Sequence, residues 1–218
     1  MIAAATLVAT LIAQAVAPPT SVSAQEAKEG FVALFDGKSL NGWMTIPLGE
    51  NVGSWVVRDG VLTYTPGDSW IATATEYTDF VLRLEYRTGT DSDSGIFMRS
   101  TDKGYPSFTG MEIEIRNDAS GAPGPRSNTS IYGAAAPRKN VTKADGAWNA
   151  VEISLIKRRL VATLNGETIH DLDLDDPAYA DALRGPLSRR ATSGRIGFQA
   201  HATGVPVEFR NVRIKVLP

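Results

Sequence analysis

The sequence predicts an all-β sandwich, in which two sheets pack face to face around one core. Short runs rich in Val, Ile, Phe and Tyr recur along the chain between Gly, Asp, Asn and Pro, and few windows show a helical period. If the uncharged first 24 of the 218 residues are set aside, 194 remain. That length suits one sandwich better than two small domains.

The N-terminal segment has the pattern of a secretory signal. Its first 24 residues contain no Asp, Glu, Lys or Arg, and residues 2–16 are small or apolar except for Gln14. The apolar run is too short to span a bilayer, and residues 22–24 offer the small residues that a signal peptidase needs. We therefore expect a signal peptide over 1–24, a domain over 25–218 and export to the periplasm or the extracellular space. No Lys or Arg precedes the run, although a signal normally opens with one. A buried N-terminal helix is the alternative.

Ten strands are expected in the domain, and two of the turns between them are specific. Asp59-Gly60 and Asn165-Gly166 combine residues that tolerate positive φ in tight hairpin turns. The expected strands cover residues 31–35, 54–57, 61–64, 80–87, 95–99, 111–115, 149–156, 160–164, 194–200 and 207–216.

The segments between the strands include two long loops and one modest helical signal. The loops at 101–110 and 117–128 are rich in Gly, Pro and Ser, and long structured loops on a rigid sandwich commonly carry function. Residues 177–183 are the only candidate helix.

Composition excludes several classes of function. The chain has 22 basic and 24 acidic residues, a formal net charge of −2, and its densest basic cluster, residues 157–159, fits a turn between two strands. A nucleic-acid partner is therefore not expected, because such binders carry a basic surplus or stripe. The chain has no cysteine, which excludes disulfides, thiolate catalysis and thiolate metal sites.

Two expected strands alternate between apolar and charged residues. Residues 80–87 place Phe, Leu and Tyr on one face and Arg and Glu on the other, and Glu112, Glu114 and Arg116 alternate with three apolar residues. If both strands lie in one sheet, its outer face presents carboxylates beside guanidinium groups, which can hydrogen-bond sugar hydroxyls. The alternative, a solvated face with cross-strand ion pairs, is favoured by the alternation alone.

Nine short sequence motifs resemble those of one known family in their order and spacing. They are 31–43 (FVALFDGKSLNGW), 55–62 (WVVRDGVL), 94–99 (SGIFMR), 110–115 (GMEIEI), 131–133 (IYG), 148–149 (WN), 164–166 (LNG), 194–201 (GRIGFQAH) and 207–215 (VEFRNVRIK). The family is the 3-keto-disaccharide hydrolase domain, and the resemblance covers nearly the whole chain after residue 24. It implies a concanavalin A-like jelly-roll sandwich with one concave polar sheet, and export.

The resemblance also implies an activity, namely cleavage of glycosides already oxidised to a ketone at C3 of the sugar ring. Such a ketone acidifies the proton on C2, so that elimination at C1 followed by addition of water releases the aglycone. The site then needs a base near C2, a donor or cation near the C3 oxygen and an acid for the departing oxygen. A non-catalytic carbohydrate-binding module and an interaction scaffold are the alternatives on the same fold.

Matching phrases place the candidate catalytic residues, with Glu112 and His201 as base or acid, Arg99 as the cation for a carbonyl oxygen, and Glu114 beside Glu112. His201 precedes a loop with Gly and Pro, whereas the other histidine, His170, is expected to be exposed. The candidate substrate-binding residues are Asp118, Tyr132, Lys139, Trp148 and Gln199. Trp148 could equally be a core residue, and Tyr132 could merely close a strand.

No cofactor is expected from the sequence. Glu112, Glu114, Asp118 and His201 could supply oxygen and nitrogen ligands to a divalent ion, which would stabilise an enolate, but no close spacing demands one. The residues after His201 differ from the family pattern, because Ala202-Thr203-Gly204 stands where a glycine is expected directly. This departure leaves the choice of sugar and aglycone open. The sequence does not indicate the oligomeric state.

Overall fold

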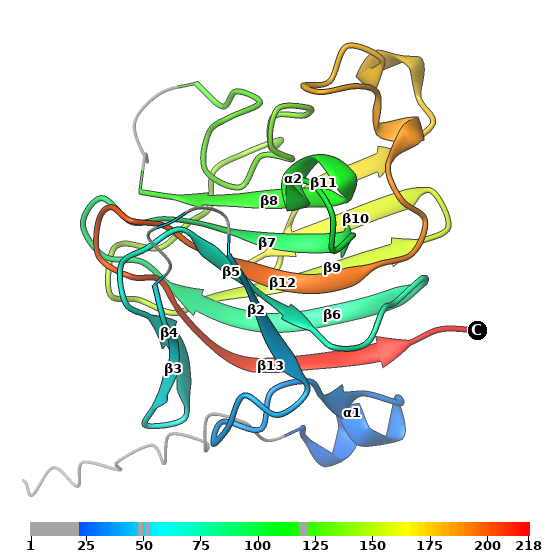
Figure 1. The fold of residues 1–218 in the computed structure, drawn as a ribbon. Coiled ribbons are helices and arrows are strands. Elements are labelled where there is room, and N and C mark those ends of the chain that lie inside the picture. Colours follow the sequence, from blue (N-terminus) through cyan, green and yellow to red (C-terminus); the bar gives the residue numbers. More distant parts are fainter. Residues whose placement is uncertain (1–21, 48–49, 51–52, 118–121) are drawn as a thin grey trace, which may run out of the picture.

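The computed structural model describes residues 22–47, 50, 53–117 and 122–218, and it confirms the expected all-β jelly-roll sandwich (Figure 1). Two antiparallel sheets lie face to face, one with eight strands and one with five. Most of the expected signal peptide, residues 1–21, lies outside the described residues. No helix among the residues described has the length and apolar character needed to cross a membrane.

The eight-stranded sheet forms one layer of the sandwich. Its order is β11 (Glu167–Asp173), β10 (Arg159–Leu164), β9 (Asn149–Ile156), β6 (Phe80–Arg87), β13 (Glu208–Val216), β4 (Val61–Tyr64) and β3 (Trp55–Arg58), with β1 (Val32–Ala33) also paired to β13. The two predicted hairpin turns are confirmed. Asp59 and Gly60 connect β3 to β4, and Asn165 and Gly166 connect β10 to β11, all four with positive φ.

The five-stranded sheet forms the second layer. Its order is β2 (Trp43–Pro47), β5 (Ser69–Thr73), β12 (Arg195–Ala200), β7 (Asp93–Ser100) and β8 (Met111–Arg116). The helical elements among the described residues are short: α1 (Ala24–Lys28), α2 (Pro106–Thr109), η1 (Pro177–Tyr179) and η2 (Leu187–Arg189). The helix α2 connects β7 to β8 and lies against one end of these two strands (Figure 1).

All ten expected strands are present, and three further strands, β2, β5 and β11, were not expected. Every residue of β5 is buried, so the alternation that marks a half-exposed strand is missing. The helix expected over 177–183 is wrong beyond its first turn. The amide of Leu183 donates to the carbonyl of Gly133, a distant partner, which replaces the continuation of a helix.

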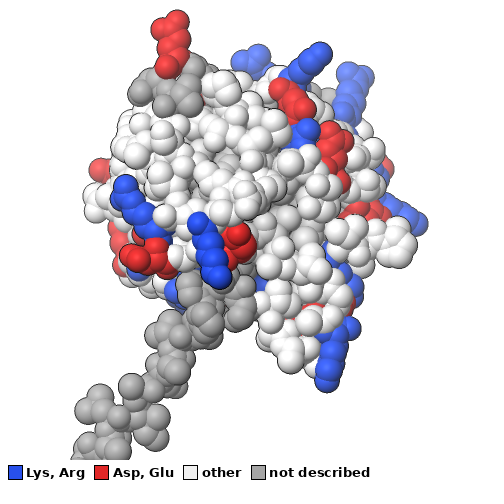
Figure 2. All heavy atoms as spheres, turned by 60° about the horizontal axis from the view of Figure 1, so that its bottom comes forward, with Lys and Arg blue, Asp and Glu red and all other residues white. Residues whose placement is uncertain are grey.

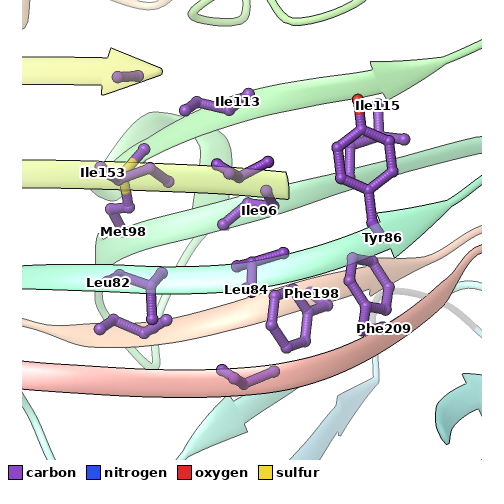
Figure 3. Close-up of a cluster of buried hydrophobic side chains, with 14 of the residues drawn as sticks. Leu82, Leu84, Tyr86, Ile96, Met98, Ile113, Ile115, Ile153, Phe198 and Phe209 are labelled. Carbon is purple, nitrogen blue, oxygen red and sulfur yellow. The ribbon is translucent and has the colours of Figure 1, made fainter. Parts of the chain in front are cut away.

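The core fills the space between the two sheets (Figure 3). Phe198 of β12 stacks on Phe209 of β13 with ring centroids 4.2 Å apart, and this pair joins the two layers. Both rings are fully buried, and each such side chain contributes about 1.5–3 kcal/mol through removal from water. The core therefore packs the five-stranded sheet against the eight-stranded sheet.

The charged faces of β6 and β8 do not share a sheet, so the hypothesis of one common polar face is wrong. The charged residues of β6 lie on the outer face of the eight-stranded sheet in cross-strand ion pairs. Arg83 pairs with Glu152 at 2.6 Å, and Glu85 pairs with Arg210 at 2.7 Å. On the face shown in Figure 2, acidic and basic side chains likewise lie next to one another. For β6 the simpler interpretation, a solvated face with ion pairs, is correct.

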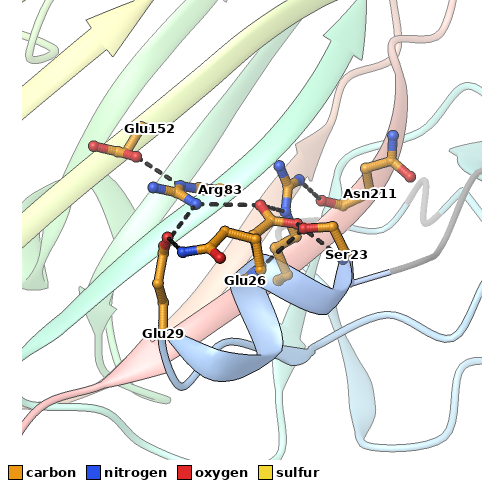
Figure 4. A network of polar contacts seen from close by, with 8 residues as sticks. Ser23, Glu26, Glu29, Arg83, Glu152 and Asn211 are labelled. Atoms are coloured by element: carbon orange, nitrogen blue, oxygen red, sulfur yellow. Dashed lines mark hydrogen bonds and ion pairs between the residues drawn. The ribbon is translucent and has the colours of Figure 1, made fainter.

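The helix α1 docks on this outer face through Glu26 (Figure 4). Glu26 accepts hydrogen bonds from Arg213 at 2.6 Å and Arg83 at 3.2 Å, and Ser23 caps the helix. Although burial raises the pKa of Glu26, the bonds from Arg213 and Ser23 lower it to about 2. The expected cleavage point after Ala24 falls in the first turn of this helix, before Glu26.

Candidate active site

A pocket of about 420 Å³ lies on the five-stranded sheet, at the end where β8 and the loop after β12 meet α2. A volume of this size suits a small ligand. Its walls contain carboxylates, two arginines, aromatic rings, an amide and an imidazole. They are Asp93, Tyr105, Ser107, Phe108, Glu112, Glu114, Arg116, Tyr132, Arg184, Gln199 and His201.

The strand β8 sends its carboxylates into this pocket because of its alternation. Ile113 and Ile115 point to the core, so Glu112 and Glu114 point to the outer face of the sheet. The antiparallel register with β7 places Gly95 opposite Glu114 and Asp93 opposite Arg116. Two neighbouring strands thus bring three carboxylates and one guanidinium group to a single site.

Glu112 occupies space that Gly95 leaves open. A β-carbon built on Gly95 would lie 1.9 Å from Oε1 of Glu112 and 2.7 Å from its carboxyl carbon. The carboxyl group therefore lies over the backbone of β7 at Gly95, and any larger residue at position 95 would displace it. The side chain of Glu112 is consequently buried, although it lies on the outer face of a sheet.

Burial changes the protonation of Glu112. It raises the pKa of Glu112 to about 8; the hydrogen bond from Ser107 opposes this rise, and the charge of Asp93 adds to it. Oε1 of Glu112 has no hydrogen-bond partner among the described residues. A buried carboxyl that stays protonated at neutral pH is suited to donate a proton.

Glu114 lies beside the cation of the same strand. Its Oε1 is 3.8 Å from Nε of Arg116, whose side chain is 43% exposed. Arg116 therefore combines one carboxylate neighbour with free access to the pocket, and can hold an oxyanion that forms there.

Aromatic residues form the opposite wall. The ring of Phe108 lies 6.0 Å from that of Tyr105 and 6.2 Å from that of Tyr132, centroid to centroid. Tyr132 is held there because the amide of Tyr132 donates to the carbonyl of Glu112, and the amide of Thr129 donates to that of Glu114. The segment that contains Thr129 and Tyr132 thus pairs with the free edge of β8. Such rings can pack on the apolar faces of a sugar.

Gln199 and His201 complete the polar wall from β12 and the loop behind it. Nδ1 of His201 lies 3.0 Å from Oγ1 of Thr203. Gly204 fixes this loop: its φ is +75°, and a β-carbon there would lie 1.8 Å from the carbonyl oxygen of Asp91. The residues after His201 that differ from the family pattern therefore form a turn, and this turn holds the imidazole at the pocket.

Of the candidate site residues named in the sequence analysis, the structure brings five together in the walls of this pocket: Glu112, Glu114, His201, Tyr132 and Gln199. Asp118 lies outside the described residues. Among the residues described, no three His, Asp or Glu side chains come together as metal ligands.

Arg99 is not in the pocket, which corrects the expectation that it binds a carbonyl oxygen there. It is fully buried, and its guanidinium group donates to the carbonyls of Thr78 and Lys157 and to Asp79. Arg99 has φ of +52° at an irregularity in the pairing of β7 with β12. This irregularity turns the side chain inward, where simple alternation would place it outside.

Lys139, Trp148 and His170 also lie elsewhere. Lys139 forms an ion pair with Glu167 at the edge of the eight-stranded sheet. Trp148 is neither core nor pocket: Arg210 lies 3.9 Å from its ring centroid, on the charged outer face. His170, expected to be exposed, is buried, and its Nε2 lies 2.7 Å from the carbonyl oxygen of Thr129.

The sequence analysis missed six wall residues. Asp93 and Arg116 lie just outside the strands expected at 95–99 and 111–115, and they could have been found by extending those strands. The two residues are direct cross-strand partners. The other four are Tyr105, Ser107, Phe108 and Arg184, which reach the pocket from α2 and from the segment after η1. No pattern in the sequence indicates where such loop segments dock.

The fold and the pocket together define a class, a jelly-roll sandwich with an acid-lined pocket on one sheet. Residues 30–215 match the family described as the 3-keto-alpha-glucoside-1,2-lyase-like domain, and the chain belongs to that family. A 3-keto-disaccharide hydrolase of Bacteroides thetaiotaomicron is 26% identical, covering 87% of this chain and 79% of that protein.

Solved structures agree on the architecture. A crystal structure of a candidate glycosyl hydrolase from Parabacteroides distasonis superposes with a TM-score of 0.80 at 23% identity, over 91% of this chain and 99% of that one. A second such protein of the same organism gives a TM-score of 0.74 at 27% identity, over 86% and 99% of the two chains.

Proposed function

We propose that this protein is a hydrolase that cleaves glycosides already oxidised to a ketone at C3 of the sugar ring. Membership of the 3-keto-alpha-glucoside-1,2-lyase-like family and similarity to a 3-keto-disaccharide hydrolase support this substrate class. The observation that carries the proposal is Glu112, a buried carboxyl whose pKa burial raises to about 8, in a pocket with an imidazole and two arginines.

In the proposed reaction His201 removes the proton from C2, and the electron pair moves to the C3 oxygen as an enolate. Arg116 faces that oxygen and stabilises its charge, the role expected of Arg99. The enolate then collapses, the bond from C1 to the departing oxygen breaks, and Glu112 gives that oxygen its proton. The sugar is left with a double bond between C1 and C2.

Addition of water completes the reaction. Glu112, now ionised, takes a proton from water, whose oxygen bonds to C1. His201 exchanges the proton that it took from C2 with solvent and then gives a proton back to C2. The product is the free 3-keto sugar, and both residues return to their starting states. Asp93 and Glu114 act through their neighbours in this scheme: Asp93 helps to keep Glu112 protonated, and Glu114 orients Arg116.

A direct assay separates this proposal from a carbohydrate-binding module on the same fold. The protein is incubated with a 3-keto-disaccharide and with the same disaccharide before oxidation, and sugar release is followed. We expect release from the oxidised substrate alone, and its loss in Glu112→Gln. Binding of both disaccharides with no release from either would favour the non-catalytic module.

We also infer that the protein is exported. The uncharged, apolar first 24 residues support this inference. The full chain is expressed in a bacterial host, and the periplasmic protein is analysed by N-terminal sequencing. A new N-terminus at Gln25 is expected, and a cytoplasmic protein that retains Met1 would contradict export.

A further inference from the structure

We propose that Arg184 binds a negatively charged group on the departing aglycone, so that the enzyme favours aryl 3-keto-glycosides that carry a carboxylate. This inference rests on the proposed function for the reaction itself, but the binding preference can be tested without it. Arg184 is exposed, lines the pocket and forms no ion pair with any residue that the structure describes.

The backbone around Arg184 is built to hold this position. Arg184 has φ of +64°, a conformation that L-residues rarely adopt and that costs on the order of 1 kcal/mol. The preceding residue, Leu183, packs against Gly133, where a β-carbon would lie 2.5 Å from that of Leu183. Its amide also donates to the carbonyl of Gly133 at 2.8 Å. The segment is thereby fixed beside Tyr132.

A second arginine holds the same segment in place through hydrogen bonds to its backbone. Arg190 is 5% exposed, and its Nη2 donates to the carbonyls of Leu183 at 2.7 Å and Gly185 at 3.3 Å, on either side of Arg184. Its Nη1 donates to the carbonyl of Phe108. The guanidinium group of Arg190 therefore binds backbone carbonyls, whereas that of Arg184 is available to a ligand in the pocket.

The surroundings of Arg184 indicate what kind of group it meets. Its Cζ lies 5.7 Å from the ring centroid of Phe108, at the centre of the wall formed with Tyr105 and Tyr132. Tyr105 is 53% exposed. An aromatic leaving group can stack on this wall, and a carboxylate on it then reaches the guanidinium group in a bidentate pair.

The acidic residues of the pocket and Arg184 come from different elements of the fold. The carboxyl groups of Glu112, Glu114 and Asp93 come from β7 and β8, whereas Arg184 comes from the segment after η1. The sugar is thus expected over the two strands and its aglycone along the aromatic wall. This division assigns the anion to the aglycone and not to the sugar.

The test uses two aryl 3-keto-glucosides that differ only in charge. One releases 4-(carboxymethyl)phenol and the other 4-(carbamoylmethyl)phenol, so the size and basicity of the leaving groups are matched. We expect the native enzyme to prefer the acid by about tenfold in kcat/KM, the effect of one charge-assisted contact. Arg184→Gln should lose this preference, so that its kcat/KM values on the two substrates become equal.

Arg189→Gln is the matched control, because Arg189 is an exposed neighbour outside the pocket walls. It should keep the tenfold preference. An equal rate on both substrates in the native enzyme, or a preference that survives in Arg184→Gln, would overturn the inference.

A binding measurement separates this inference from the proposed reaction. The two unoxidised aryl glucosides are compared by ligand-observed NMR on the native protein and on Arg184→Gln. If neither keto substrate is turned over, the proposed function fails, while tighter binding of the acid that depends on Arg184 still supports the inference. Equal binding of acid and amide would contradict it whatever the activity.

Discussion

The carboxyl group of Glu112 lies over Gly95 of the neighbouring strand, in the space where a β-carbon would stand 1.9 Å from Oε1. This contact is what buries the carboxyl, and burial is what keeps it protonated. The backbone of Gly95 does not have positive φ, so alanine can adopt its conformation. A substitution at Gly95 therefore tests the placement of the Glu112 carboxyl without altering Glu112 itself.

Gly95→Ala should displace the Glu112 carboxyl and lower kcat on a 3-keto-disaccharide by about 100-fold, because proton transfer depends on position. The cost in unfolding free energy should be about 1–3 kcal/mol, as for other overpacked sites. Activity assays and urea unfolding measure the two effects.

Gly124→Ala is the control for this substitution, since a β-carbon at Gly124 meets nothing within 4 Å. It should leave both activity and stability close to native. Native activity in Gly95→Ala would show that the position of the Glu112 carboxyl is not important for the reaction.

Glu112→Gln should reduce kcat by about 10²–10⁴-fold, the usual contribution of a general acid. In the native enzyme, kcat/KM should fall above pH 8, because burial raises the pKa of Glu112 to about 8 and the ionised form cannot donate a proton. A pH–rate profile that stays flat from pH 7 to 9.5 would argue against Glu112 as the acid.

The same pKa predicts how stability depends on pH. Below the ordinary pKa of 4.5 the group is protonated in both states; between 4.5 and about 8 the folded chain holds a proton that the unfolded chain has lost. Stability contributed by the protonated group is thus lost as pH rises, by at most about 1.4 kcal/mol per pH unit. Glu112→Gln lacks this loss, so its stability relative to native should increase between pH 5 and pH 8. Parallel urea-unfolding profiles for the two proteins would contradict the buried, neutral carboxyl.

Arg99→Gln should lower stability and spare catalysis. The substitution leaves Asp79 and two backbone carbonyls without their buried partner, and breaking such a pair costs about 3–5 kcal/mol. At a temperature where the variant is folded, kcat per folded molecule should match the native value. A specific loss of kcat with unchanged stability would show that Arg99 takes part in the reaction.

The sandwich and half of the polar wall could be predicted from the sequence because they follow from local patterns. Alternation in β8 places Glu112 and Glu114 on one face, and a Gly and a Pro after His201 indicate a loop. The same rule failed for Arg99, because an irregularity in the pairing of β7 with β12 reverses its side chain. Alternation holds only while the register is unbroken.

Long-range docking could not be predicted. Arg184 reaches the pocket because Leu183 packs on Gly133 and Arg190 clamps the backbone, contacts between segments with no shared pattern in the sequence. His170 is buried for a similar reason, since the carbonyl of Thr129 lies against its ring. The assignment of β6 and β8 to different sheets likewise depends on the order of strands, which alternation does not contain.

Deuterium incorporation tests the proposed reaction most directly. The enzyme is incubated with a 3-keto-disaccharide in D₂O, and the released 3-keto sugar is examined by NMR during the first turnovers, beside a sample without enzyme. Elimination followed by addition of water predicts deuterium at C2 of the product above the enzyme-free background, and no such product from Glu112→Gln. Rapid release of a sugar that retains its original hydrogen at C2 would contradict the elimination and the role given to this pocket.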